Sequence, residues 1–543
     1  MKLTSVLPKI FFSVSLIFIS LFPLFAEEGN QDWFRRKFTL ELKDNNSFYT
    51  NDTLLTKLTE GQYTISDNSL HLTGVLKDST VTESFKILTN IDTKFALEKD
   101  GKRITFLTDD KTVEASLSGY GLLRGFIGLI SLLVIAYLFS KNRKRINWPL
   151  VIKGILLQII IAVLILEVPF IEKIFDFLSQ AFVKVVDMSH EGAMFLFSSV
   201  ITGEMSPMVV NFVTWVLPSI LFFSALSSLF YYWGILQKIV YGMAWLMKRV
   251  MGLSGAESIS AAGNVFLGQT EAPFLVKPYL NKMTDSEIVC LMTGGMATIA
   301  GGVLAAYIGF LGGGDPAQQV FFAKHLLTAS LMSAPAAIVF SKILLPEVEK
   351  FNEDLTVSKD KLGVNALEAI SNGTVDGLKL AANVAAMLLV FVSLIALANF
   401  ILGKVGFWTG LNDIIALNSS LYTELSFQYI VGNILAPVSW LMGVPWQDAM
   451  IIGQLLGEKT IINEFVAYPH LAELQDELTQ KSVIIGTYVL CGFSNISSIG
   501  IQVGGIGALV PEKKSTLARY GVTALIGGTL ACMTTAVIVG TLF

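Results

Sequence analysis

The sequence predicts an all-α polytopic membrane protein with eight transmembrane helices, two re-entrant hairpins in an inverted repeat, and a small extra-cytoplasmic β domain at the N-terminus. Three observations support this class. Hydrophobic residues make up 53% of the 543 residues and charged residues only 15%, whereas a soluble domain has roughly 25% charged residues. Apolar runs long enough to cross a hydrocarbon core recur from residue 121 onward. Residues 27–118 are polar instead and alternate with a period of two.

The first 26 residues resemble a secretory signal peptide. Lys2 and Lys9 precede or flank an apolar core that ends at Ala26, before acidic residues. Leu24 stands where a small residue is preferred before the cleavage point, so an uncleaved anchor remains an alternative. Either way, the segment that follows is expected outside the cytoplasm.

That following segment, 27–118, is expected to be a small antiparallel β domain. Period-two alternation punctuated by Asn, Asp and Gly is typical of strands joined by turns. The strands are expected at 38–43, 69–75, 94–99 and 103–108.

Lys and Arg near the span ends set the expected topology. The charged stretches at 141–145, 248–249, 346–363 and 511–519 are expected in the cytoplasm, and eight crossings then place the C-terminus on the outer face. An amphipathic segment near 170–188 is expected along the outer surface. The spans are expected at about 121–139, 149–167, 209–232, 286–310, 319–344, 380–402, 482–508 and 517–541.

Two apolar segments are too interrupted by Gly, Pro and charge to be full crossings: segment 1 (256–281) and segment 2 (445–470). Broken backbone at membrane depth is tolerated where it lines a cavity, so we expect re-entrant hairpins. An odd number of spans separates them, so segment 2 should enter from the opposite face. Each is followed by a span with a glycine- and hydroxyl-rich interruption. Inverted repeats of discontinuous helices are typical of secondary transporters.

Each segment carries a central carboxylate, Glu271 in the first and Glu464 in the second. Ionisable groups at membrane depth are costly and usually line a pathway, which favours a binding role over a buried structural pair. Amides and hydroxyls in segment 1 and in the interrupted span after segment 2 are weaker candidates, because such groups also hydrogen-bond between helices. These weaker candidates are Gln269, Thr270, Asn495 and Ser498.

Other chemistries find less support. GQLLGEKT (453–460) departs from a phosphate-binding loop in its glycine spacing and in placing Glu458 before the lysine, so uphill transport should draw on an ion gradient. An intramembrane enzyme using Glu271 and Glu464 as an acid/base pair would need a nucleophile or a metal, and the four histidines are scattered. The three cysteines are expected to be packing residues.

Three motifs, in this order and spacing, resemble the signature segments of the concentrative nucleoside transporters: GQTEAP (268–273), NEFVAY (463–468) and CGFSNISSIG (491–500). The resemblance covers about 121–543. It implies a homotrimer in the cell inner membrane, with a scaffold near the three-fold axis and a mobile transport domain that carries both hairpins. The implied partners are a nucleoside substrate and the lipid bilayer, with no nucleic acid.

The resemblance also implies a division of the binding site between base and sugar. A ribose diol offers two donors, which a carboxylate beside an amide and a hydroxyl can satisfy. By motif position, the residues facing the nucleobase would be Gln269, Thr270 and Glu271, with Val303 nearby. Those facing the ribose would be Glu464, Asn495 and Ser498, with Phe493 lining the sugar side.

A sodium site is implied near the tip of segment 1. Its ligands would be the side chains of Asn264, Thr270 and Thr298 with the backbone carbonyls of Leu267 and Ile299, all oxygen atoms. Proton-coupled members tend to lack parts of this set, so co-transported sodium is favoured. The ion would order the hairpin tip and so promote nucleoside binding.

The expected function is therefore a sodium-driven nucleoside symporter, not an enzyme, that imports its substrate by elevator-type alternating access. A proton-coupled transporter and a transporter-derived nutrient sensor with the β domain as input are the alternatives. The family core does not require the β domain, whose role is left open. The expected units are 1–26 signal peptide, 27–118 β domain, 119–234 scaffold helices, 235–345 first transport repeat, 346–379 cytoplasmic linker, 380–424 scaffold helix and loop, and 425–543 second transport repeat.

Overall fold

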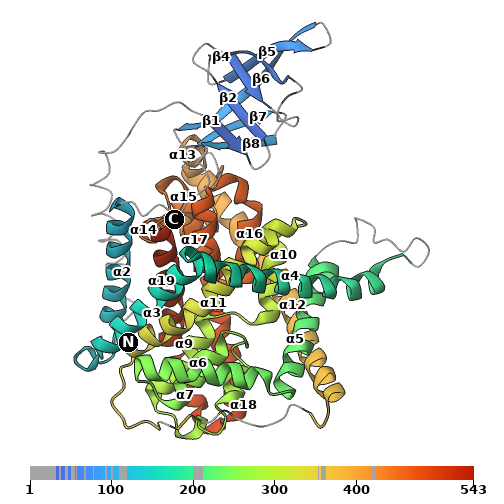
Figure 1. Ribbon diagram of the computed structural model, residues 1–543. Helices are drawn as coiled ribbons and strands as arrows, with labels where there is room; N and C mark the ends of the chain where they lie inside the picture. The colour runs from blue at the N-terminus through green and yellow to red at the C-terminus, as the bar shows by residue number, and fades with distance from the viewer. Residues whose placement is uncertain are drawn as a thin grey trace.

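The computed structural model describes residues 32–108, 119–199, 212–418 and 422–543, with short gaps between the strands and at 353, 356 and 358–362. The predicted signal peptide lies outside the described residues. Figure 1 shows a small unit of strands at one end of a much larger bundle of helices.

The strands form a closed antiparallel barrel in which each strand pairs with the next and β1 pairs with β8. The four segments predicted as strands are β2, β5, β7 and β8. Leu70 and Leu72 point into the barrel, and Leu70 lies opposite Phe85 of β6, so apolar side chains fill the interior. The strands are β1 (Asp32–Arg35), β2 (Phe38–Leu42), β3 (Ser47–Thr50), β4 (Glu60–Ser66), β5 (Ser69–Leu76), β6 (Ser79–Ile91), β7 (Lys94–Lys99) and β8 (Lys102–Thr108).

Helices make up the described chain beyond residue 119. They are α2 (Gly119–Phe139), α3 (Trp148–Glu167), α4 (Pro169–Phe197), α5 (Leu217–Tyr232), α6 (Ile235–Met251), α7 (Gly255–Asn264), α8 (Ala272–Leu275), α9 (Asp285–Ala297), α10 (Gly301–Gly312), α11 (Pro316–Leu344), α12 (Ala366–Thr409), α13 (Leu411–Asn418), α14 (Phe427–Leu441), α15 (Trp446–Ile461), α16 (Glu464–Glu473), α17 (Gln480–Leu490), α18 (Ile496–Leu509) and α19 (Lys514–Leu542).

Among the described residues, six helical stretches are long and apolar enough to cross a membrane, or up to eight if each of two bent pairs is one span. Six of the predicted spans coincide with these stretches. The predicted span at 209–232 falls in the bent pair α5–α6, which turns by 77°. The predicted span at 482–508 is the broken pair α17–α18 and is not among the six. The count of eight spans stays a prediction.

The helix expected at 380–402 is much longer than the sequence indicated. α12 extends over 44 residues from Ala366 to Thr409, so the latter part of the expected linker is helical. Asn365 accepts a hydrogen bond from the backbone N–H of Glu368 and caps the helix. An apolar-run criterion places the start too late, because the first turns of α12 are polar.

Segments 1 and 2 begin two series of elements with the same order. Segment 1 comprises α7 and the short α8, followed by the broken pair α9–α10 and the 29-residue helix α11. Segment 2 comprises α15 and α16, followed by the broken pair α17–α18 and the 29-residue helix α19. The breaks fall at the glycine- and hydroxyl-rich interruptions, as expected.

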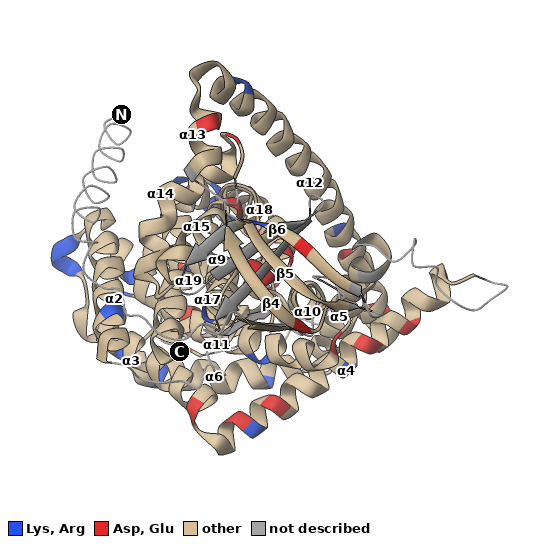
Figure 2. Ribbon diagram, turned by 90° about the horizontal axis from the view of Figure 1, so that it is seen from above, with Lys and Arg blue, Asp and Glu red and all other residues tan. Residues whose placement is uncertain are grey.

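The amphipathic segment near 170–188 lies within α4, a helix at the edge of the bundle with acidic and basic residues along it (Figure 2). Lys324 of α11 holds it with ion pairs to Glu172 at 2.9 Å and Asp176 at 3.1 Å. These contacts fasten α4 across α11.

Candidate functional site

The first half of the candidate site joins segment 2 to the break between α17 and α18. Asn463 caps α16 by accepting from the backbone N–H of Val466, which makes Glu464 the first residue of that helix. A carboxylate is favoured at a helix N-terminus. The Glu464 side chain is 2% exposed and accepts a hydrogen bond from Asn495 Nδ2 at 2.9 Å. Two residues predicted to face the sugar are therefore in direct contact.

Asn495 also connects this pair to the third sugar-facing candidate. Its Oδ1 accepts from the backbone N–H of Ser498 at 2.8 Å and so caps α18. The Ser498 hydroxyl in turn accepts from Gln269 Nε2 at 3.1 Å. A continuous chain of hydrogen bonds therefore runs from Glu464 in segment 2 to Gln269 in segment 1.

Gln502, one turn after Ser498 on α18, extends this chain and was missed by the sequence analysis. It is fully buried, and its Nε2 donates to Gln269 Oε1 and to the Met292 carbonyl, both at 3.0 Å. Its position four residues after Ser498, on the same helix face, is the signal that could have found it. The amide oxygen of Gln269 thus accepts a hydrogen bond from Gln502, and its amide nitrogen donates one to Ser498.

Glu271 and Thr270 border this chain of hydrogen bonds. The Glu271 carboxylate folds over Gly268, where an added Cβ would lie 2.1 Å from Oε2, and the residue is exposed in the single chain. The Thr270 methyl faces Gly505 of α18, where an added Cβ would lie 2.9 Å away. Glycine at 268 and 505 therefore leaves room for these two side chains.

The breaks of the two interrupted helices meet directly. The backbone N–H of Phe493 donates to the Thr298 carbonyl at 3.3 Å, and Gly492, with φ +144°, approaches the Ala297 carbonyl so closely that a Cβ would lie 2.8 Å from it. Phe493 is buried at this crossing, and Val303 is fully buried in the core beyond it. The predicted place of Val303 beside the nucleobase stays a prediction.

Two of the predicted sodium ligands converge on Gly294 of α9. Asn264 is 1% exposed and lies against Gly294, where an added Cβ would be 2.8 Å from Nδ2. The Thr298 hydroxyl donates to the Gly294 carbonyl at 2.9 Å. Among the described residues, neither polar atom of the Asn264 side chain has a hydrogen-bond partner, although buried polar groups are normally paired.

Acidic or imidazole clusters do not account for cation binding in the described ranges. There, no group of three His, Cys, Asp or Glu side chains could hold a metal ion. A cation beside Asn264 would be bound instead by amide, hydroxyl and backbone carbonyl oxygens.

An aromatic cluster behind Glu464 also escaped the sequence analysis. Tyr307 of α10 stacks on Tyr468 of α16, with ring centroids 4.1 Å apart, and meets Phe465 edge-on at 5.3 Å. The Tyr468 hydroxyl donates to the Thr487 carbonyl at 2.9 Å. These rings pack α16 against α10 and so fix the helix that carries Glu464.

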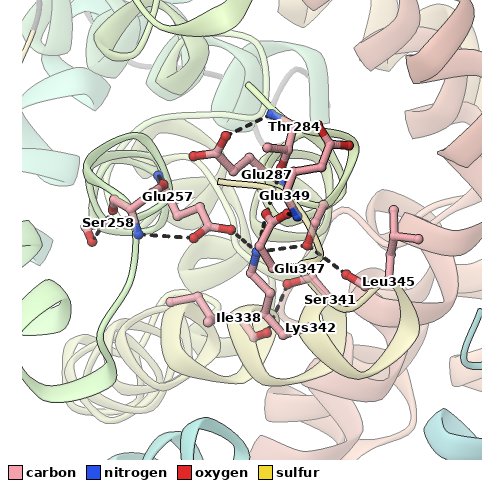
Figure 3. A network of polar contacts seen from close by, with 12 residues as sticks. Glu257, Ser258, Thr284, Glu287, Ile338, Ser341, Lys342, Leu345, Glu347 and Glu349 are labelled. Atoms are coloured by element: carbon pink, nitrogen blue, oxygen red, sulfur yellow. Dashed lines mark hydrogen bonds and ion pairs between the residues drawn. The ribbon is translucent and has the colours of Figure 1, made fainter. Parts of the chain in front are cut away.

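A separate polar network holds the start of segment 1 (Figure 3). The buried Lys342 ammonium pairs with Glu257 of α7 and donates to Ser286 Oγ at 2.8 Å. Thr284 Oγ1 donates to Glu347 at 2.7 Å, and Lys342 lies 3.5 Å from the same carboxylate oxygen. The network joins α7, α9, α11 and the start of the linker, and it contains none of the predicted binding residues.

Family models match most of the helical part of the chain. The N-terminal and C-terminal models of the Na+ dependent nucleoside transporters match residues 127–200 and 325–540, and a nucleoside recognition (gate) model matches 213–314. The chain belongs to the sodium-dependent nucleoside transporter family. The predicted resemblance is therefore confirmed, and this family is one of transporters rather than of enzymes.

Individual members of the nucleoside transporter family agree with this assignment. Mouse solute carrier family 28 member 3 is 40% identical over 435 residues, which cover 77% of this chain and 58% of the mouse protein. The nucleoside permease NupC of Helicobacter pylori is 37% identical, with 76% of this chain and 96% of the permease covered. A solved structure of CNTnw in an inward-facing substrate-bound state has 35% identity and a TM-score of 0.69, covering 78% of this chain and 99% of that one.

The matched models begin at residue 127, so the β barrel lies outside the part shared with the nucleoside transporter family. The shared part covers almost the whole of the H. pylori permease. That relative therefore has the family core without the barrel, and the barrel is an addition to it.

Proposed function

We propose that this chain is a secondary active symporter that imports nucleosides with sodium. The observation that carries the proposal is the chain of hydrogen bonds from Glu464 through Asn495 and Ser498 to Gln269, buried between the helices of the bundle. This chain of hydrogen bonds links segment 1 to segment 2. Secondary transporters place their substrate sites between such interrupted segments.

The site's chemistry suits a nucleoside at both ends. Glu464 and Asn495 offer acceptors and a donor for the ribose hydroxyls, and a carboxylate has lone pairs for further bonds beyond the one from Asn495. Gln269 presents an amide fixed in orientation, with Thr270 and Glu271 beside it. Amide and carboxylate groups match the mixed donors and acceptors on a nucleobase edge.

Sodium is proposed as the co-transported ion, bound by Asn264, Thr270 and Thr298 with the carbonyls of Leu267 and Ile299. The two unpartnered polar atoms of the buried Asn264 amide support a ligand there, because an unpaired buried amide is costly. Oxygen ligands are also what a hard monovalent cation prefers.

The proposed movement is of the elevator type, with segments 1 and 2 as oppositely oriented re-entrant hairpins in a mobile domain. The repeated element order supports the repeat. The apolar window of α12 is only 6% buried within one chain, which supports a scaffold role and a homotrimer. We place the protein in the cell inner membrane, with the barrel and the C-terminus on the outer face.

The decisive experiment is radiolabelled uridine or adenosine uptake into proteoliposomes, with a sodium or a proton gradient imposed separately. Sodium should drive accumulation. Glu464→Gln should abolish it, because it removes the charge proposed to bind the ribose, whereas Glu191→Gln on α4 should transport normally. Normal uptake by Glu464→Gln would refute the ribose assignment, and accumulation with a proton gradient alone would refute sodium coupling.

The sodium site has its own test in the Asn264→Ala variant. The variant should require about tenfold more sodium for half-maximal uptake, as expected from loss of one ligand worth about 1.4 kcal/mol. Asn433→Ala is the matched control, because that amide donates to the Tyr429 carbonyl of its own helix. An unchanged sodium dependence of Asn264→Ala would contradict the assignment.

A further inference from the structure

The two arms of segment 2 are joined by a carboxylate and an imidazole that the proposed transport site does not use. Glu458 lies on α15 and His470 on α16, and His470 Nδ1 is 2.9 Å from Glu458 Oε2. The Glu458 side chain is fully buried, whereas that of His470 is 32% exposed. The imidazole therefore connects a buried anion to the surface of the segment.

Both carboxylate oxygens of Glu458 are engaged. Gln454 Nε2 donates to the second oxygen, Oε1, at 3.1 Å, and the Tyr422 hydroxyl donates to the Gln454 amide oxygen. With a neutral imidazole, this cluster holds a buried negative charge that no cation of the cluster balances. A proton on Nε2 of His470 creates a charge-assisted pair, which is the stronger kind of hydrogen bond.

Among the charged and titratable groups around His470, Glu458 is the one that pairs with the imidazole. On its own helix, Glu473 follows one turn later and adds a second negative charge. From α15, the Lys459 ammonium points away and donates to the Val489 carbonyl.

The other elements packed against α16 are α10, α12, α17 and the turn η4 (Gln475–Glu477). Lys481 on α17 and Asp476 and Glu477 on η4 are charged, but the charges that act on the His470 imidazole are those of Glu458 and Glu473. α10 presents Tyr307, which stacks on Tyr468, and α17 presents Tyr488, which lies beside His325. α12 has no charged residue between Lys379 and Lys404. The buried Glu458 carboxylate and the partly exposed His470 imidazole therefore form a pair suited to bind a proton.

We propose that His470 and Glu458 form a proton-binding site in segment 2, separate from the sodium site in segment 1, and that proton binding strengthens nucleoside binding. This rests on the proposed transport function. Glu464 is the first residue of α16, the same helix that carries His470. Locking α16 to α15 therefore steadies the carboxylate proposed to hold the ribose. By linkage, nucleoside binding then favours proton uptake.

The test measures the apparent KM for uridine in proteoliposomes at saturating sodium between pH 5.5 and 8. Histidine titrates within this range, so the wild-type KM should fall about fivefold or more as the pH decreases, the size typical of coupled sites. In His470→Gln, an amide can still bond Glu458 but cannot titrate, and the KM should not change with pH. His190→Gln is the matched control, another histidine near an acid, at 4.0 Å from Asp187 on α4, and it should keep the wild-type pH dependence.

A second variant guards against misfolding of the first. Glu458→Gln removes the charge that favours the proton, so the midpoint of the pH dependence should move down by about one unit. A wild-type KM that is flat with pH, or a His470→Gln variant that keeps the wild-type dependence, would overturn the proton site. Absence of sodium-driven uptake at every pH would overturn the transport function itself, so the two failures are distinguishable.

Discussion

At the scale of single residues, Gln502 supports the candidate site through hydrogen bonds. Its amide donates at once to Gln269 and to the Met292 carbonyl, and it is completely buried. Because Gln502 fixes which end of the Gln269 amide is the acceptor, the Gln269 donor is directed to Ser498. Gln502 thus sets the orientation of the Gln269 amide within the candidate site.

Replacing Gln502 with leucine should weaken nucleoside binding. The change leaves Gln269 Oε1 and the Met292 carbonyl without their donor, and an unsatisfied buried group costs about 1–3 kcal/mol. We expect the KM for uridine to rise about tenfold with smaller effects on maximal rate, measured by uptake in proteoliposomes. Gln158→Leu is the control, because that buried amide donates within α3, to Gly154. Equal KM values for the two variants would contradict the role of Gln502.

At the scale of elements, Arg124 fastens α2 to the entry of segment 2. Its Nε donates to the Trp440 carbonyl at 2.9 Å, and its terminal nitrogen also bonds the Val444 carbonyl. The guanidinium lies over the Trp440 ring, 4.7 Å from the centroid. Gly128 allows the close approach of α2, since a Cβ there would lie 2.3 Å from the Leu441 carbonyl. The bend between α14 and α15 is therefore held from outside the segment.

Arg124→Gln should destabilise the folded protein. Hydrogen bonds from a charged donor contribute about 1.5–3 kcal/mol, and the shorter neutral side chain cannot reach both carbonyls. A lower thermal unfolding midpoint in detergent, by several degrees, is the expected result. Arg143→Gln provides the comparison, because Arg143 is exposed and bonds carbonyls at the end of α2 itself. If both variants unfold at the wild-type temperature, Arg124 does not hold the bend.

Element boundaries show what could be predicted from the sequence. Segments 1 and 2 and the interruptions after them were predicted because Gly, Pro and buried polar groups act on the local backbone. The early start of α12 was not predicted, because it depends on the packing of this helix against α5. Gly373 and Gly377 approach the α5 backbone there, and a Cβ on Gly377 would lie 2.9 Å from Leu221 Cα. Such a contact between distant segments leaves no periodic signal.

The candidate site divides in the same way. Glu464, Asn495, Ser498 and Gln269 were predicted, and the structure links them by hydrogen bonds. Gln502 and the aromatic cluster around Tyr307 were missed, because a buried glutamine or tyrosine is recognisable as part of a site only once its partner helix is known. Glu271 was predicted beside Gln269 but lies outside the chain of hydrogen bonds.

At the scale of the whole molecule, the barrel and the helical part are separable in composition and in core. The barrel has its own apolar core, and the helices α2 to α19 contain all of the family matches. Strand β8 lies beside the short turn η4 (Gln475–Glu477) that follows segment 2. The barrel therefore sits next to the end of segment 2, and none of the candidate site residues lies on its described strands.

Phe85→Ala should unfold the barrel while sparing transport. Phe85 is 1% exposed in the barrel core, and truncating a buried phenylalanine costs about 3–5 kcal/mol. Limited proteolysis should cut residues 32–108 of the variant faster than those of the wild type, and uridine uptake should remain within about twofold of the wild-type value. Loss of uptake from a correctly inserted helical part would show that the barrel takes part in transport.

The closure of the barrel between β1 and β8 also affects how neighbouring copies of the protein can interact in the membrane. An open sheet would present a row of free backbone donors and acceptors to every neighbouring copy, and such rims nucleate aggregation. A closed barrel has no unpaired edge of that kind. Neighbouring copies of the protein can therefore lie close together without their β domains pairing edge to edge.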